Sequence, residues 1–254
     1  GFKFPALRLP KVAVPVAFSH RFQSISIKIK EQSTSTITSG GTLIAASIFA
    51  SVFNFLYNAY LVRALELEEF GLISLIGNFI FLTSIPLGAL SRTIVYRSAY
   101  LFGKYKTHAR KFWVYVRRRS ILISVAVTAA WVAFTPFLSS FFHSESWLPF
   151  FLFAPVWTIG VAAAVDQGYL NGNLKFKVLS VLIIAESLIK FLVTWTLVEL
   201  DLKNYVYSAI PISMTASFII GWFFANSIKG EKLSLDEKVV HKFPVNFLIS
   251  SVFS

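Results

Sequence analysis

Residues 70–97 read FGLISLIGNFIFLTSIPLGALSRTIVYR, and this stretch decides the fold class. Positions 70–91 carry no charged side chain, and a helix of about 20 apolar residues is long enough to cross a bilayer. Outward from this stretch, five further apolar segments lie at residues 41–63, 118–142, 147–170, 176–199 and 204–228, and a seventh begins near Val245. The sequence therefore predicts an all-α, polytopic membrane protein with six complete transmembrane helices and the start of a seventh.

The composition of the 254 residues excludes several classes of protein. Hydrophobic residues make up 56% of the chain and charged residues 14%, whereas about 25% charge is typical of a soluble domain. The net charge of +12 comes from basic residues placed between apolar runs, not from one face of a soluble fold, so we expect no nucleic-acid partner. The absence of cysteine excludes a disulfide framework and a cysteine-ligated metal.

The chain is expected to have four regions. They are a basic cytoplasmic tail (1–37), a six-helix transmembrane lobe (38–228), a cytoplasmic connection (229–244) and the start of a truncated seventh helix (245–254). Within the tail, residues 22–30 alternate apolar and polar side chains, which is weak strand character. Because residue 1 is Gly and the only Met is Met214, we expect a fragment of a longer chain that lacks its carboxy-terminal lobe.

Basic residues are distributed very unevenly over the connections. The tail and the even-numbered connections carry 19 Lys and Arg, and the odd-numbered connections carry 2, Arg63 and Lys203. Because cytoplasmic loops are enriched in these residues, the amino terminus is expected to be cytoplasmic in a multi-pass protein of the cell inner (plasma) membrane. The three arginines at residues 117–119 are expected to meet anionic membrane lipids.

A stripe of polar residues runs along the first apolar segment. Ser47, Ser51, Asn54 and Asn58 are spaced by four, three and four residues, which places them on one face of a helix. A polar stripe on a spanning helix faces protein or water. Two interpretations stay open, hydrogen bonding to neighbouring helices and the lining of a cavity, and in the second Asn54 and Asn58 bind substrate.

Two charged residues, Glu186 and Lys190, lie near the middle of the segment at 176–199, where a charge costs about 2.5–3.5 kcal/mol. Glu four residues before Lys is the favourable order for a helical ion pair, and Thr194 continues the same face. One interpretation is a self-neutralising pair. The other is the charged wall of a cavity, with Lys190 binding substrate and Glu186 coupling an ion.

Arg92 and Arg97 lie toward the cytoplasmic end of the second segment. Each either extends to the lipid headgroups or presents its guanidinium to an anionic substrate. The sequence contains no phosphate-binding G-x-x-x-x-G-K-[ST] loop, no metal-binding spacing and no recognisable Ser/His/Asp set. We therefore expect no cofactor, no metal and no enzymatic activity.

The fourth apolar segment carries small residues at every fourth position. Gly160, Ala164 and Gly168 form a ridge of the kind that allows close contact between membrane helices. Asp166 points away from this ridge and is expected to be interfacial and hydrated. As an ionisable residue near the membrane, it is also a second candidate for ion coupling.

Three stretches resemble a known family. Residues 60–79 (YLVRALELEEFGLISLIGNF) are similar to the R-x-L-G-x-x-E-[FY]-G turn of polysaccharide flippases, with Glu66 where that family often has Gly. Residues 166–191 (DQGYLNGNLKFKVLSVLIIAESLIKF) look like its Q-G-x-L-x-G-x-x-[RK]-[FY] junction. Residues 94–113 resemble its Arg-bearing helix end and basic connection. The resemblance, to Wzx-like flippases of the MOP superfamily, covers about residues 38–254.

This resemblance implies one lobe of a MOP-type transporter, with two helical bundles around a central cavity and alternating access. The implied substrate is a polyprenyl-diphosphate-linked oligosaccharide, moved from the cytoplasmic to the outer leaflet for surface polysaccharide biosynthesis. A MATE-like cation-coupled multidrug antiporter is the alternative, although residues 41–63 contain no Asp or Glu. A membrane-embedded enzyme or scaffold would need a long outward loop, and these loops are short. For a flippase, Arg92, Arg97, Lys190 and the polar stripe should converge on one cavity.

Overall fold

The structure is a computed structural model that describes residues 16–105, 110–144 and 146–228, together with positions 244, 248, 249 and 252. Side chains are described from residue 40 onward. The chain divides into two units, residues 1–40 and 41–254. Most of the predicted connection at 229–244 and of the predicted seventh helix at 245–254 lies outside the described residues.

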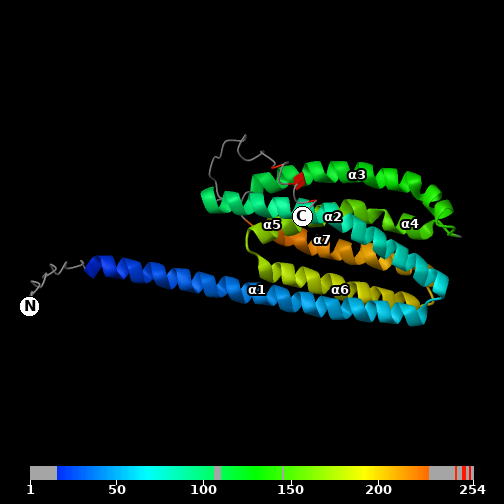
Figure 1. Ribbon diagram of the computed structural model, residues 1–254, viewed down its shortest axis with the longest axis horizontal. Helices are drawn as coiled ribbons and strands as arrows, with labels where there is room; N and C mark the ends of the chain where they lie inside the picture. Colours follow the sequence, from blue (N-terminus) through cyan, green and yellow to red (C-terminus); the bar gives the residue numbers. More distant parts are fainter. Residues whose placement is uncertain are drawn as a thin grey trace, which may run out of the picture. The chain divides into compact units, whose positions relative to one another are not determined.

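The described residues form helices and no strand, which confirms the predicted all-α class (Figure 1). The elements are α1 (Val16–Ala64), α2 (Leu67–Tyr105), α3 (Arg110–Phe141), α4 (Leu148–Phe153), α5 (Pro155–Gly172), α6 (Phe176–Glu199), the 3₁₀ helix η1 (Lys203–Ser208) and α7 (Ala209–Ser227).

Five helical stretches are long and apolar enough to cross a membrane. They are Gly40–Ala64, Leu67–Tyr105, Arg110–Phe141, Leu148–Gly172 and Lys203–Ser227. This pattern is consistent with a multi-pass membrane protein. Helix α6 coincides with the predicted segment at 176–199 but is not among the five, so six spans and a seventh are not confirmed.

The weak strand character of residues 22–30 is a wrong prediction, because these residues lie in α1. An alternating stretch of this kind needs a partner strand before it is stable as a strand, and the described residues supply none. The predicted tail at 1–37 is therefore helical from Val16 onward, while residues 1–15 lie outside the described part of the chain.

Local sequence explains where the helices begin. Glu68 and Glu69 occupy the first turn of α2, where carboxylates interact favourably with the helix dipole. The backbone N–H of Glu66 donates to Oε2 of Glu69 at 3.3 Å. Pro155 occupies the first turn of α5, where its missing N–H costs no helical hydrogen bond, and it separates α5 from α4.

Helix α5 is the central element of the unit formed by residues 41–254, since it packs against α2, α3 and α7. The predicted small-residue ridge lies on its contact with α2. A Cβ added at Gly160 would lie 3.0 Å from Cδ1 of Leu87, and one at Gly168 would lie 2.8 Å from the carbonyl oxygen of Ser91. Gly172 extends the ridge, with a Cβ position 2.6 Å from Cβ of Ser98.

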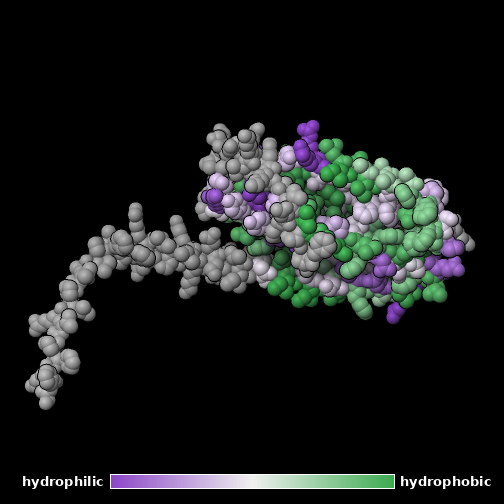
Figure 2. Space-filling view, turned by 45° about the horizontal axis from the view of Figure 1, so that its top comes forward, coloured by the Kyte–Doolittle hydropathy of each residue, from purple (hydrophilic) through white to green (hydrophobic). Residues whose placement is uncertain are grey.

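The buried side chains of this unit form two apolar clusters. One includes Phe112, Trp113 and Tyr169 near the connections between α2 and α3 and between α5 and α6. The other includes Leu61 and Phe153 near the opposite connections. Many large apolar side chains remain exposed, and Figure 2 shows them over much of the visible helical surface, with the most hydrophilic residues mainly toward its ends. Such a surface is suited to contact with lipid.

Candidate functional site

Lys190 of α6 contacts two residues of α1 through its side chain. Its ammonium nitrogen Nζ donates a hydrogen bond to the amide oxygen Oδ1 of Asn54, and it lies 4.7 Å from the centre of the Tyr57 ring. Phe191 supports this contact, because its ring meets those of Phe53 and Tyr60 edge-on at centroid distances of 6.0 and 6.3 Å. The lysine is thus held in place by a neutral amide and an aromatic face.

Glu186, one turn before Lys190, faces α7. It lies beside Ser217, whose Oγ is buried without a hydrogen bond of good geometry, and it interacts electrostatically with Lys190. The ion pair found among the described residues is Arg117–Asp166, so the predicted Glu186–Lys190 ion pair does not form. The reason is that the Lys190 side chain reaches across to Asn54 instead.

Thr194 continues the same face of α6, and its buried Oγ1 has no hydrogen-bond partner among the described residues. We define the Lys190 cluster as a group of polar and aromatic side chains from α1, α6 and α7. Its members are Asn54, Tyr57, Glu186, Lys190, Thr194 and Ser217.

The rest of the predicted polar stripe does not join this cluster. Ser47 and Ser51 donate to the backbone carbonyls one turn earlier in α1, at 2.9 Å in both cases. Asn58 donates to the carbonyl oxygen of Asn54 at 2.9 Å. All three residues are exposed, and only Asn54 reaches another helix through its side chain.

The two candidate arginines of α2 also lie apart from the Lys190 cluster. Arg92 is exposed, and the guanidinium carbon of Arg97 lies 5.3 Å from the centre of the Tyr100 ring on the next turn. Neither arginine is among the contacts of Lys190. The structure therefore unites Asn54, Glu186 and Lys190, and the predicted convergence of Arg92, Arg97 and Asn58 with them stays a prediction.

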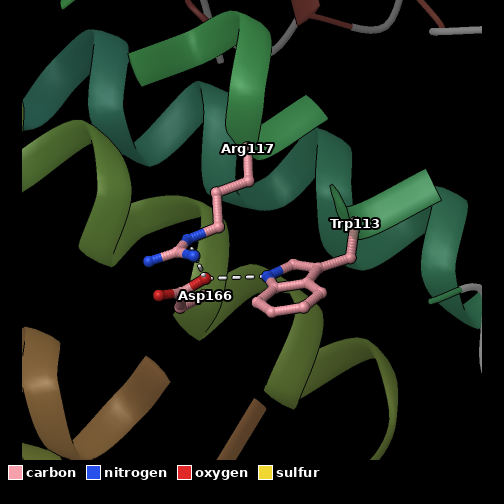
Figure 3. Close-up of polar contacts among 3 residues, drawn as sticks. All are labelled: Trp113, Arg117 and Asp166. Atoms are coloured by element: carbon pink, nitrogen blue, oxygen red, sulfur yellow. Dashed lines mark hydrogen bonds and ion pairs between the residues drawn. The ribbon is translucent and has the colours of Figure 1, made fainter. Parts of the chain in front are cut away.

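Asp166 belongs to a second polar group, at the junction of α3 and α5 (Figure 3). The indole Nε1 of Trp113 donates to Oδ1 of Asp166 at 2.7 Å, and Nε of Arg117 lies 3.3 Å from the same oxygen. Asp166 is 1% exposed. The prediction of an interfacial, hydrated carboxylate is therefore wrong, because α3 covers this face of α5.

Arg117 differs from its two neighbours in the run of arginines. Its guanidinium carbon lies 5.4 Å from the ring centres of Trp113 and Phe218 and 5.8 Å from that of Trp222, whereas Arg118 and Arg119 are exposed. The prediction that all three meet lipid headgroups is thus wrong for Arg117. The sequence held a signal for this, since Trp113 and Arg117 are four residues apart and share one helix face.

The two groups have different chemical capacities. Asp166 is paired with Arg117 through Oδ1, and aromatic rings surround the arginine, so this group has the character of a structural contact, although Oδ2 of Asp166 is buried without a hydrogen bond. The half-buried ammonium group of Lys190 donates to a neutral amide and interacts electrostatically with Glu186, without a direct ion pair among the described residues. The described residues contain no cluster of three or more His, Asp or Glu side chains that would hold a metal ion.

Compared with known proteins, the chain matches no protein-family model, no curated protein and no solved structure. What the fold itself defines is an all-helical chain with several membrane-length apolar helices, consistent with a multi-pass membrane protein.

Proposed function

We propose that this chain forms one lobe of a transporter that flips a polyprenyl-diphosphate-linked oligosaccharide from the cytoplasmic to the outer leaflet by alternating access. The other lobe is the expected carboxy-terminal partner. The observation that carries the proposal is Lys190, a half-buried cation near the middle of an apolar helix whose hydrogen bond goes to an amide and not to a carboxylate.

The chemistry of such a substrate fits this arrangement. A lipid-linked diphosphate brings negative charge toward the membrane interior, where an unpaired ion is costly. A lysine provides a compact cation with three donors, of which Asn54 uses one. The remaining donors are available to phosphate oxygens, and the buried hydroxyls of Thr194 and Ser217 lie in the same cluster.

The distribution of charge along the chain adds a second support. Nineteen basic residues on the tail and even-numbered connections, against two on the odd-numbered ones, favour entry of an anionic substrate from the cytoplasmic side. No bond is broken in this process. The energy for a net movement of charge is available from the membrane potential, at about 2.3 kcal/mol per charge per 100 mV.

The test is restoration of surface polysaccharide in a flippase-deficient cell by the whole protein, with Lys190→Met as the variant. We expect export to fall about ten- to hundredfold, because a hydrogen bond to a charged group contributes about 1.5–3 kcal/mol. The matched control is Lys177→Met, which removes an exposed lysine from the first turn of the same helix and should leave export unchanged.

Normal export by a well-expressed Lys190→Met variant would overturn the role given to this lysine. Failure of the unaltered, well-expressed protein with a suitable glycan would overturn the flippase function. Transport of an organic cation that depends on Glu186 and not on Lys190 would instead favour the antiporter.

A further inference from the structure

A cavity of about 690 Å³ lies at the end of the helical unit that carries the α1–α2, α3–α4 and α6–η1 connections. Three stretches of sequence enclose it: the start of α2, the segment around His143 with the start of α4, and η1. Its volume lies within the range of about 300–1,000 Å³ that is usual for small-molecule sites. Its lining includes Glu68, Glu69, His143 and Tyr207.

The rim of this cavity is fixed by its own backbone and side-chain hydrogen bonds. His143 has a φ of 53°, and its N–H donates to the carbonyl of Ser140 at 3.2 Å, which ends α3 in a tight turn. Ser144 donates to the carbonyl of Ser146 at 2.8 Å, and Ser146 Oγ accepts from the N–H of Leu148 at 3.2 Å. The rim therefore presents a preformed surface.

Tyr207 contributes to the cavity wall from η1. The residue is 8% exposed and packs into the apolar cluster around Leu61, yet it lines the cavity. Because Glu69 interacts electrostatically with Tyr207, the hydroxyl and this carboxylate occupy one part of the wall.

The charge of the lining restricts the ligand. Two carboxylates contribute to the wall, and none of the described lining residues is Lys or Arg. An anion such as phosphate is repelled by this arrangement. A molecule rich in hydroxyl groups is favoured, because hydroxyls donate short, strong hydrogen bonds to carboxylates. Asn204 and Tyr207 add groups that both donate and accept.

We propose that this cavity binds a non-anionic saccharide unit. The inference rests on the proposed function, since it assigns the saccharide part of that substrate to the end of the lobe expected to face outward, away from Lys190. The cavity and the Lys190 cluster thus separate the two chemistries of one ligand, with hydroxyls at the acidic cavity and phosphate at the lysine.

The test measures binding of three trisaccharides of equal length to the purified whole protein in detergent, by saturation-transfer NMR. The probes are the trimers of glucosamine, N-acetylglucosamine and galacturonic acid. We expect the first two to bind and the acidic trimer to bind at least about tenfold more weakly, because of like-charge repulsion.

Two variants locate the site. Glu68→Gln removes an exposed carboxylate without touching the core, and Tyr207→Phe removes only the hydroxyl. Each should weaken binding of the N-acetylglucosamine trimer about three- to tenfold, the amount expected for one hydrogen bond. Asp201→Asn, an exposed carboxylate near η1 that does not line the cavity, is the matched control and should bind like the unaltered protein.

Absence of binding, equal binding of the acidic trimer, or unchanged binding by both variants would overturn the inference. Polysaccharide export in the flippase-deficient cell distinguishes a failure of this inference from a failure of the proposed function. Saccharide binding without export would overturn the flippase function and leave the cavity as a saccharide site. Export that persists without saccharide binding would overturn the cavity site alone.

Discussion

Two polar groups lie within the helices of this protein, and they are built in opposite ways. At the α3–α5 junction, Asp166 pairs with Arg117 and accepts a hydrogen bond from Trp113, and aromatic rings surround the arginine. In the Lys190 cluster, Glu186 and Lys190 are neighbours on one helix, yet their side chains turn toward different helices, and the lysine bonds to an amide.

The difference shows why buried charge alone does not indicate function. A charge that is paired and enclosed stabilises one arrangement of helices and has little capacity left for a ligand. A charge without a direct ion-pair partner keeps more of its electrostatic field, at a cost in stability. The first group therefore belongs to the architecture, and the second is the better candidate for a substrate.

The largest effect is expected from Asp166→Ala. Removal of this carboxylate leaves Arg117, which is 19% exposed, without its ion-pair partner, and breaking such a pair costs about 3–5 kcal/mol. The free energy of unfolding in mixed detergent micelles measures the loss. Arg117→Met added to Asp166→Ala should recover part of it, because no charge is then stranded.

For the same variant, Asp201→Asn serves as the control: Asp201 is exposed and has a φ of 58°, which Asn tolerates as well as Asp, so this change should alter stability by less than about 0.5 kcal/mol. If Asp166→Ala costs no more than this control, the group at α3 and α5 has no structural role and the contrast with Lys190 disappears.

Asn54→Asp should give the Lys190 cluster a direct ion pair, like that between Asp166 and Arg117. A carboxylate at position 54 would pair with Lys190 and cancel its charge, so export should fall about ten- to hundredfold, the effect of losing a charged hydrogen bond of about 1.5–3 kcal/mol. Export by the flippase-deficient cell is the measurement. Asn58→Asp, which adds the same charge one turn away on an exposed position, should have a much smaller effect.

Equal export by the Asn54→Asp and Asn58→Asp variants would show that the charge state of Lys190 has no bearing on transport.

Gly168→Ala should disturb the Asp166 group more than the Lys190 cluster. Its Cβ would lie 2.8 Å from the carbonyl oxygen of Ser91, so α5 must move relative to α2, at a cost of about 1–3 kcal/mol. Unfolding in micelles measures this cost. Gly77→Ala is the matched control, because nothing lies within 4 Å of its Cβ position, and it should be neutral or stabilising.

A Gly168→Ala variant as stable as Gly77→Ala would mean that α2 and α5 do not make the close contact described above.

The smallest effect is expected from Tyr60→Phe, at the edge of the α1–α6 contact. The hydroxyl of Tyr60 donates to Oε1 of Glu199 at 3.4 Å in an exposed position, and surface changes of this kind stay within about 0.5 kcal/mol. Unfolding in micelles provides the measurement. Glu199→Gln should behave alike, and a large loss in either variant would make this contact a major link between the helices.

Hydropathy and small-residue spacing predicted much of the fold. The apolar segments coincide with helices, and the ridge at Gly160, Ala164 and Gly168 lies on a close helix contact as expected. Both signals depend on side-chain size and polarity at fixed spacing, so they can be read without knowledge of the neighbouring helices.

Side-chain partners were harder to predict, because they depend on which helix covers which face. The order Glu186 before Lys190 favours an ion pair on an isolated helix, but the structure places Asn54 within reach of the lysine. Likewise, the sequence offers three consecutive arginines, and only the packing of α3 on α5 shows that Arg117 turns inward.

One signal was present in the sequence and remained unused. Helix α7 repeats small residues at every fourth position, and all of them are buried; they are Ala209, Ser213, Ser217, Gly221 and Ala225. This spacing is the same as that of the ridge on α5. It predicts the close packing of α7, including the placement of Ser217 beside Glu186.

The ridge on α5 also sets the axial register of two helices. Sliding α5 along α2 by one turn, about 5.4 Å, so that Ala164 takes the place of Gly168 would bring its methyl group against the carbonyl oxygen of Ser91, which lies 2.8 Å from a Cβ at that position. In the opposite direction, Ala164 at the Gly160 position would meet the end of the Leu87 side chain, which can adjust. The backbone of α2 therefore opposes translation of α5 more strongly in one direction than in the other.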